Sequence, residues 1–461
     1  MIVMKFGGTS VEDAAAMNRV IDIIRKGAPR RPLVVLSACA RVTNELIRVA
    51  HTVRDGDEPA ALAILDGLRL RHRGIAQELI GSKGASQLSE VFAAIDDMFL
   101  ELRNFIHGVY LLGELTHRSL DMLTSFGERL SSIILDAGLR VRGVPARLVD
   151  ARQVMVTDNC YSAAQPLMEK VAGRAATEFL SVLNAGEAVI TQGFIGAAED
   201  GTTTTIGRGG SDLSAAIFGS VLGAEEIQIW TDVDGMMSAD PRTVPGSRPI
   251  SVLSFSEASE LAYFGAKVLH PKTIQPAVQR SIPVRVLNSM RPELPGTLIL
   301  ASVDPSTRSS ADVIKSIAFK KGIIVINVSS SRMLMAHGFL AKLFSIFADH
   351  RKSVDVVATS EVSVSLTVDS EDGLPEIIQS LSEIGETRIF RKKAIICIVG
   401  EGMKHTPGIA ARIFGALARA SVNIEMVSEG ASEINLTLVV DEKAVEQSVR
   451  VLHEEFFTPN N

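Results

Sequence analysis

Residues 202–224, TTTTIGRGGSDLSAAIFGSVLGA, decide the fold that we expect, because they read as a strand, a glycine turn and a helix. Threonines favour an extended backbone, and the glycines of GRGG at 207–210 permit positive φ angles. Ser211 is expected to cap the helix and Gly223 to end it. Such a turn presents free N–H groups to a phosphate or carboxylate, and Arg208 adds a guanidinium for the same anions. Taken alone, the stretch also fits an ordinary tight turn.

The same order of elements recurs along the first 300 residues. IVMKF at 2–6 is an apolar strand, GGTS follows it, and residues 11–27 have the apolar spacing of a helix. Residues 45–140 carry helical patterns and predict a helical lobe. Further strands are predicted within 31–40, 187–196, 225–242 and 281–289. Repeated strand, turn and helix units predict an α/β fold, a three-layer αβα sandwich around a mainly parallel sheet.

The last third of the chain contains an internal repeat. Residues 323–369 and 394–441 each run from an apolar strand through a glycine-led helix to two strands, and a further helix follows each copy. This order begins a βαββαβ pattern. The second copy lacks its last strand, so we expect residues 314–321 to supply it, with the first unit nested inside the second. The expected domains are 1–300, a linker at 301–313, 314–392 and 393–461.

The composition is that of a globular protein, with 46% hydrophobic and 22% charged residues. A net charge of −6 argues against nucleic acid or an anionic membrane as the main partner. No apolar run is long enough to span a membrane, and MIVMKFGGTS lacks the apolar region of a signal peptide. Cys39, Cys160 and Cys397 lie far apart without metal-ligand spacing. We therefore expect a cytoplasmic protein with reduced, structural thiols.

Several common nucleotide and hydrolase motifs are absent from the sequence. It has no Walker A pattern, no HRD and DFG pair, no HExxH helix and no GxSxG elbow. Asp212 stands where a dinucleotide fingerprint needs its third glycine. An acid at that position would repel a phosphate unless a lysine or metal compensated for it, so NAD binding is disfavoured.

Six motifs in order carry a resemblance to a known family. They are KFGGTS at 5–10, SFGERLS at 125–131, TQGFIG at 191–196, TIGRGGSD at 205–212, WTDVDG through ADPR at 230–242 and FGAKVLHP at 264–271. Together with the terminal repeat they resemble the aspartate kinases of the amino acid kinase family over essentially the whole chain. The resemblance implies an amino acid kinase fold followed by two ferredoxin-like ACT domains. It also implies phosphorylation of the β-carboxylate of L-aspartate by ATP, the first step towards lysine, threonine and methionine.

The implied chemistry needs no general base, because a carboxylate is already ionised at neutral pH. Catalysis then consists of holding two anions together and neutralising the charge on the transferred group. The resemblance assigns Lys5 to that charge, Asp212 to orienting the lysine, Arg208 to a substrate carboxylate and Glu128 to the substrate ammonium. The other implied aspartate contacts are Ser37, Thr43, Phe194, Gly209, Gly210 and Ser211.

The resemblance also implies a nucleotide site. Its residues, besides Lys5, are Gly7, Gly8, Ser10, Thr231, Asp232, Met237, Asp240, Arg242, Lys267 and Val268. Met237 is a departure, since the lysine-sensitive bacterial form has tyrosine there, although a thioether can still pack on adenine. Mg²⁺ is expected to arrive on the ATP phosphates and to keep water ligands, so no protein ligand is predicted.

ACT units usually pair and bind amino acids at the shared interface, which implies a homodimer or a tetramer. Positions that bind lysine in lysine-inhibited relatives match Met333, Gly338, Phe339, Leu340, Val354, Asp355, Thr359, Ser360 and Glu361. Asp355 and Glu361 would suit a cationic side chain, although both also fit surface turns. HGFLA and VDVVATSEVSVSLTVD also resemble plant and threonine-responsive forms. The resemblance thus favours lysine over threonine as feedback inhibitor.

Plainer interpretations exist for the single residues. Lys5 could be an edge charge of a strand, and Glu128 with Arg129 a solvated pair on a helix. Two other functions also stay open. The chain could be another amino acid kinase, such as one acting on acetylglutamate, although SFGER and the ACT pair oppose this. It could also be an amino-acid-sensing regulator with an inactive kinase domain, although intact Lys5, Arg208 and Asp212 oppose that.

Overall fold

The computed structural model describes residues 1–81, 84–264, 271–303, 313–333, 337–403, 406–430 and 434–458. They form two compact units. The first comprises Met1–Met236 and Val268–Ser302, and the second comprises Met237–Lys267 and Val303–Asn461. The predicted contacts Lys267 and Val268, and most of the expected linker, lie outside the described residues. Within the described part, no helix combines the length and apolar character that crossing a membrane requires.

A mainly parallel sheet organises the first unit, in the strand order β3-β5-β2-β1-β8-β10-β11. The strands are β1 Ile2–Phe6, β2 Pro32–Leu36, β3 Ala146–Leu148, β5 Ala188–Gln192, β8 Glu226–Thr231, β10 Val284–Asn288 and β11 Thr297–Leu300. Strand β1 runs parallel to β2 and β8, whereas β11 is antiparallel to β10. Every residue of β1 and β2 is buried, as expected of parallel strands covered on both faces.

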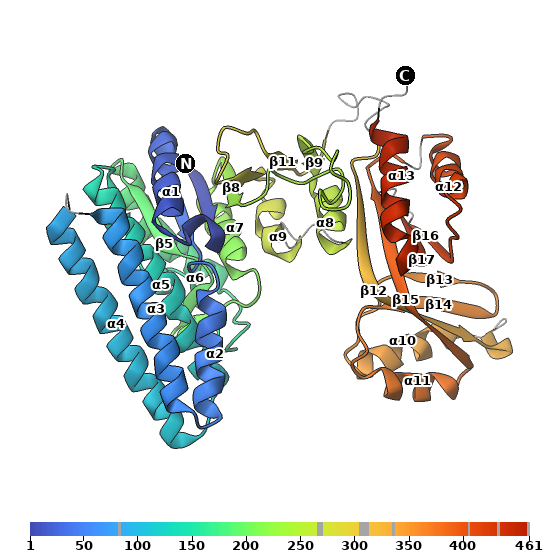
Figure 1. Ribbon diagram of the computed structural model, residues 1–461, viewed down its shortest axis with the longest axis horizontal. Coiled ribbons are helices and arrows are strands. Elements are labelled where there is room, and N and C mark those ends of the chain that lie inside the picture. Colours follow the sequence, from blue (N-terminus) through green and yellow to red (C-terminus); the bar gives the residue numbers. More distant parts are fainter. Residues whose placement is uncertain are drawn as a thin grey trace. The chain divides into compact units, whose positions relative to one another are not determined.

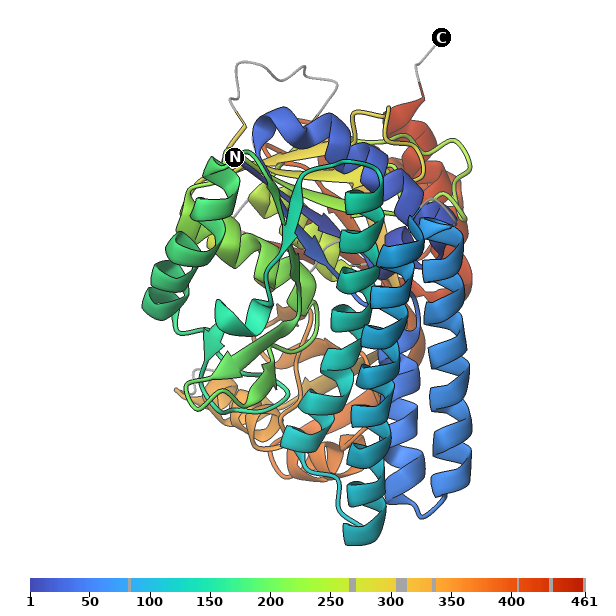
Figure 2. The same ribbon diagram turned by 90° about the vertical axis from the view of Figure 1, so that its left-hand side faces the viewer.

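Long helices cover one face of this sheet and run side by side (Figures 1 and 2). They are α1 Ala14–Gly27, α2 Val42–Arg54, α3 Glu58–Ile80, α4 Ala85–Leu112 and α5 His117–Val141. Ile2, Met4 and Phe6 join their apolar core. Because side chains alternate along a strand, Lys5 points to the other face, where α6 Met168–Asn184, α7 Gly210–Leu222 and α9 Pro271–Gln279 pack. The predicted αβα sandwich is confirmed, and helices α2 to α5 occupy the stretch that was predicted as a helical lobe.

The stretch at 202–224 folds as strand, turn and helix, with one correction. Strand β7 Thr203–Thr205 joins a small sheet with β6 Ile195–Ala198 and β4 Val156–Thr157. The N-cap of α7 is Gly209 at φ +74°, not Ser211, which lies inside the first turn. A left-handed backbone at the cap suits glycine, so the main chain rather than a hydroxyl makes this turn. Gly223 ends the helix at φ +64°, as predicted.

The second unit contains an antiparallel sheet in the order β13-β14-β12-β15-β17-β16. Its strands are β12 Ser316–Ser329, β13 Val357–Thr359, β14 Ser363–Val368, β15 Glu386–Val399, β16 Met426–Glu429 and β17 Asn435–Asp441. The helices are α10 Phe339–Asp349, α11 Leu374–Ser382, α12 Ile409–Arg419 and α13 Val445–Phe457. Helices α10 and α11 lie together, as do α12 and α13 (Figure 1). Two separate apolar cores lie against this sheet, one under each pair of helices. The two ferredoxin-like units are thereby confirmed.

The long strand β12 contributes to both halves of the sheet. Its residues 316–320 pair with 395–399 of β15, and its residues 323–329 pair with 386–393. The second unit also includes β9 Val252–Ser254 and α8 Phe255–Phe264. Ala239 and Val244 pack into the core under α12 and α13.

Candidate active site

A cavity of about 330 Å³ opens beyond the carboxyl ends of β1 and β2. The predicted residues that line it are Lys5, Gly8, Ser37, Thr43, Glu128, Phe194, Arg208, Gly209, Gly210, Ser211 and Asp212. They come from segments far apart in sequence. The parallel sheet brings them together, because loops that follow neighbouring parallel strands meet at one edge.

Lys5 is held in the cavity by an acid on α7. Its Nζ lies 2.7 Å from Asp212 Oδ1, and the two side chains are 11% and 15% exposed. Asp212 Oδ1 accepts no well-directed hydrogen bond from the described residues, so its contact with Lys5 is an ion pair without a hydrogen bond. The low exposure strengthens the pair relative to a surface salt bridge. Asp212 therefore holds the Lys5 ammonium beside the first turn of α7.

Glu128 is a buried acid with one oxygen unsatisfied. Its Oε1 accepts a hydrogen bond of 3.1 Å from the Ala38 amide, whereas Oε2 has no partner among the described residues. Burial raises the pKa of Glu128 to about 8, against an ordinary value of 4.5. An incoming ammonium group would satisfy Oε2 and favour the ionised form. The geometry of Glu128 thus suits a cation binder inside the cavity.

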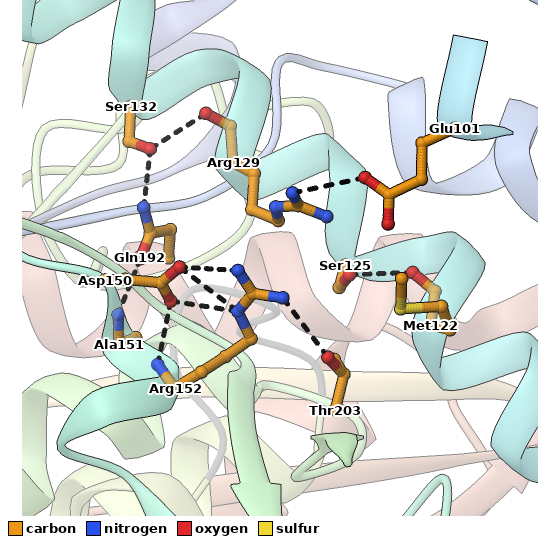
Figure 3. Close-up of polar contacts among 10 residues, drawn as sticks. All are labelled: Glu101, Met122, Ser125, Arg129, Ser132, Asp150, Ala151, Arg152, Gln192 and Thr203. Carbon is orange, nitrogen blue, oxygen red and sulfur yellow. Dashed lines mark hydrogen bonds and ion pairs between the residues drawn. The ribbon is translucent and has the colours of Figure 1, made fainter. Parts of the chain in front are cut away.

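A polar network anchors the helix that carries Glu128 (Figure 3). Gln192, at the end of β5, donates to Ser132 Oγ on α5 at 2.7 Å, and its own Oε1 accepts from the Ala151 amide at 2.7 Å. Arg152 next in the chain forms a forked contact with Asp150, with distances of 2.6–3.2 Å. The Gln192–Ser132 bond ties α5, the helix that carries Glu128, to the end of β5.

Arg129 does not pair with its neighbour Glu128. Its guanidinium lies 4.3 Å from the Phe126 ring centroid and 3.7 Å from Glu101 Oε2, as Figure 3 shows for the acid. Burial, and secondly the charge of Arg152, lower the pKa of Arg129. The interpretation of Glu128 and Arg129 as a solvated pair is therefore wrong.

The cavity is also lined by residues that were not predicted as substrate or nucleotide contacts. They are Ala38, Cys39, Ala40, Arg41, Asn44 and Gly207. Arg41 is the N-cap of α2 and adopts φ +70° in the turn that lines the cavity. Burial raises the pKa of Cys39 to about 12, so its thiol is unreactive. The segment 37–44 directly follows a buried strand. This position in the sequence could have indicated that Arg41 and Asn44 lie near the site.

The predicted nucleotide residues divide between the two units. In the first unit, Gly7 donates to Trp230 O at 3.1 Å, and Ser10 Oγ lies 2.8 Å from Ser289 Oγ. Thr231 and Asp232 lie where β8 ends. Met237 belongs to the second unit, as do Asp240 and Arg242, whose side chains form an ion pair of 2.7 Å.

The predicted effector residues lie around the start of α10 and the loops beside it. Met333, Phe339 and Val354 pack against the apolar core under α10 and α11. Gly338 is the N-cap of α10 at φ +83°, and Leu340 follows in its first turn. Thr359 ends β13, and Ser360 and Glu361 form the turn that follows.

Asp355, another predicted effector residue, already contacts two side chains. Its carboxylate accepts a hydrogen bond from the Tyr263 hydroxyl and lies 3.2 Å from Lys320 Nζ. Lys320 also contacts Asp369 at 2.9 Å. The side chain of Asp355 is 3% exposed, so the interpretation of this residue as a surface turn acid is wrong.

Comparison with known proteins identifies the class that this fold and cavity define. The profile of the amino acid kinase family matches residues 1–288, and an ACT domain profile matches residues 396–456. The chain is thus an amino acid kinase with a regulatory ACT region.

Whole-length relatives narrow the class further. Aspartokinase 1 (chloroplastic) of Arabidopsis thaliana is 37% identical over 99% of this chain and 80% of its own length. The structure of E. coli aspartokinase III with aspartate and ADP is 36% identical, with a TM-score of 0.82 over 99% of this chain and 100% of that one. The structure of the same enzyme with lysine and aspartate is 37% identical, with a TM-score of 0.81 over 99% of each chain. The chain therefore belongs to the aspartokinases, and it is a phosphotransferase.

Proposed function

We propose that this chain transfers the γ-phosphoryl group of ATP to the β-carboxylate of L-aspartate and forms 4-phospho-L-aspartate. The convergence of Lys5, Glu128, Arg208 and Asp212 on one cavity carries this proposal. The related E. coli enzyme with aspartate and ADP supports the choice of substrates.

The cavity offers both signs of charge that a zwitterionic amino acid requires. Glu128 Oε2 would take the ammonium group, because this buried oxygen has no other partner in the described structure. Arg208 would hold the α-carboxylate through its planar fork. Ser37, Thr43 and Phe194 would complete the pocket around the substrate. With both ends held, the β-carboxylate is directed towards Lys5 and the start of α7.

The cavity also suits a phosphate that is being transferred. Lys5 and the N-terminal residues of α7 line it together. The ammonium and the helix amides would neutralise the charge on the phosphoryl oxygens. Asp212 would keep Lys5 in place without acting as a base.

ATP and Mg²⁺ fit the donor set of this cavity. The described residues contain no group of three or more His, Cys, Asp or Glu side chains that could hold a metal. Mg²⁺ would therefore be held by phosphate oxygens and water, and it would shield the phosphate charge. Gly8 allows close approach at the turn, since a Cβ there would lie 2.9 Å from Ala38 O. Thr231, Asp232, Met237, Asp240, Arg242, Lys267 and Val268 remain proposed nucleotide contacts.

We further propose feedback inhibition by lysine at the ACT units, in a homodimer or a tetramer of it, with threonine as the alternative effector. The E. coli enzyme with bound lysine supports lysine, and the buried carboxylate of Asp355 suits an ammonium group. The enzyme would work in the cytoplasm, in the synthesis of lysine, threonine and methionine. The domain limits 1–300, 314–392 and 393–461 are part of this proposal.

Trapping the acyl phosphate with hydroxylamine tests the reaction directly. We expect hydroxamate with ATP, Mg²⁺ and L-aspartate, none with acetylglutamate, and a loss of turnover of about 100-fold or more in Lys5→Met. Lys26→Met, which changes an exposed lysine at the end of α1, is the matched control. Product with acetylglutamate alone would identify another amino acid kinase. Absence of any product in a folded protein would favour the amino-acid sensor.

A further inference from the structure

A second buried acid on α5 has no role in the site described above. Asp121 is 1% exposed, and no lysine, arginine or histidine in the described part of the chain forms an ion pair with it. A buried carboxylate without a cation must be held by several hydrogen-bond donors. The identity of those donors indicates what Asp121 does.

Among the described residues, the hydrogen-bond donors to the Asp121 carboxylate come from two chain segments. The Ser162 amide donates to both oxygens at 3.0 and 2.9 Å, and the Ser162 hydroxyl lies 3.3 Å from Oδ1. The Thr205 amide donates to Oδ2 at 2.9 Å and its hydroxyl to Oδ1 at 2.7 Å. Asp121 thereby bonds the segments of Ser162 and Thr205 to helix α5.

The two segments enclose the turn that carries Arg208. Thr205 is the last residue of β7, three positions before Arg208. On the other side, Gly207 packs against the segment of Ser162, since a Cβ on Gly207 would lie 3.3 Å from Ser162 O. The Ala164 amide donates to Thr205 O at 3.0 Å, which closes the two segments on each other. The position of the Arg208 turn therefore depends on the bonds to Asp121.

Asp121 and Glu128 lie on the same helix, seven positions apart. Seven residues make about two turns, so both acids lie on one face of α5. Glu128 reaches the cavity directly, whereas Asp121 reaches it through the turn of Arg208. One rigid helix thus sets the separation between the ammonium binder and the carboxylate binder.

We propose that Asp121 is a positioning residue that fixes Arg208 at the correct distance from Glu128 for L-aspartate. The inference rests on the proposed role of Arg208. Asp121 does not touch substrate. It acts on the affinity for aspartate by holding the Arg208 turn in one conformation. Changing a residue that serves stability alone would not raise the KM for aspartate while leaving the KM for ATP unchanged.

The test is Asp121→Asn, which keeps the shape but places an amide donor against two backbone donors. We expect the KM for aspartate to rise about tenfold or more, since buried amides lose their acceptor, while the KM for ATP stays within about twofold. Thr205→Val, which removes one donor, should show a smaller effect in the same direction. Asp136→Asn, a buried acid elsewhere on α5 that pairs with Arg140, is the matched control and should leave both KM values unchanged.

A double-mutant cycle with Arg208→Ala separates positioning from general damage. If Asp121 acts through Arg208, adding Asp121→Asn to Arg208→Ala should change the aspartate KM less than about twofold. The inference would be overturned if the increases in aspartate KM from the two substitutions multiplied in the double variant. It would also be overturned if Asp121→Asn raised both KM values equally or left the aspartate KM unchanged. If Arg208→Ala alone leaves the aspartate KM unchanged, the proposed carboxylate binder is wrong, whereas hydroxamate formation would still support the proposed reaction.

Discussion

Glu128→Gln should make the first unit more stable and the enzyme much worse at binding aspartate. The folded-state pKa of Glu128 is about 8 and the ordinary value is 4.5. Between these pH values the folded state binds more protons than the unfolded state. The contribution of the group is fully present below pH 4.5 and is lost as pH rises through about 8. At about 1.4 kcal/mol per pH unit, the loss amounts to about 5 kcal/mol.

Glutamine does not ionise and escapes this loss. The unfolding free energy of Glu128→Gln should therefore exceed that of the wild type by about 3 kcal/mol at pH 7 and about 5 kcal/mol above pH 8, with little difference at pH 4.5. Urea unfolding followed by tryptophan fluorescence measures this, because Trp230 is the single tryptophan and is buried on β8. Equal stability of the two proteins at pH 8 would refute the reasoning.

The same buried acid predicts a pH dependence of substrate binding. Aspartate binds the ionised form, so binding at pH 7 must release the proton of Glu128. In the wild type, the KM for aspartate should fall up to about tenfold per pH unit as pH rises towards 8, and then level off. In Glu128→Gln it should be raised about 100-fold or more and lose this slope. Calorimetry in buffers of different ionisation enthalpy would detect the released proton, and a wild-type KM that is independent of pH would contradict the assignment.

Three further predictions concern other parts of the chain. Gly193→Ala should impair aspartate binding and turnover, because its Cβ would lie 2.7 Å from Ser211 Cα and would displace a residue that lines the cavity. Its control is Gly173→Ala on α6, where the space is open; this change should leave activity intact and stabilise the helix by about 1 kcal/mol. Burial lowers the pKa of His72 to about 4, so its contribution is present above pH 6.5 and is lost as pH falls through 4. His72→Gln should therefore reduce the loss of unfolding free energy between pH 6.5 and pH 4 by about 3 kcal/mol. The same loss of unfolding free energy in this variant and the wild type would show that His72 is not its cause. Lys320→Met should lower the lysine concentration for half-inhibition, because the internal ammonium beside Asp355 would no longer compete. Lys321→Met, which removes contacts to Glu446 and the Phe319 ring but none to Asp355, should not.

The periodicity of the sequence was sufficient for the fold, because each element buries one face with a recognisable spacing. The parallel strands of the first unit and the repeat in the second are examples. The N-cap was predicted wrongly, since Ser211 has the preferred side chain but Gly209 has the required φ of +74°. Local preference for a hydroxyl lost to the backbone conformation of the turn.

The role of Asp121 could not be predicted, because its partners lie 41 and 84 positions away. In the sequence it is one polar residue in a helical pattern. The separate surroundings of Glu128 and Arg129 were hidden for the same reason, since only tertiary packing decides what each of two adjacent charges contacts. Motif resemblance found Glu128, but it gave no reason for an unpaired oxygen or a raised pKa.

The grouping of residues 237–267 with the ACT region suggests how the proposed inhibition would reach the substrates. Ser316 Oγ donates to Met237 O at 2.8 Å, and the Ile317 amide donates to Ser238 O at 2.9 Å. Ser238 Oγ also lies 2.9 Å from His453 Nε2 on α13. Met237 and Ser238, which lead into the proposed contacts Asp240 and Arg242, are therefore bonded to strand β12 and helix α13 within the second unit. An effector bound at the ACT units would therefore act on these proposed nucleotide contacts through bonds that lie inside the second unit.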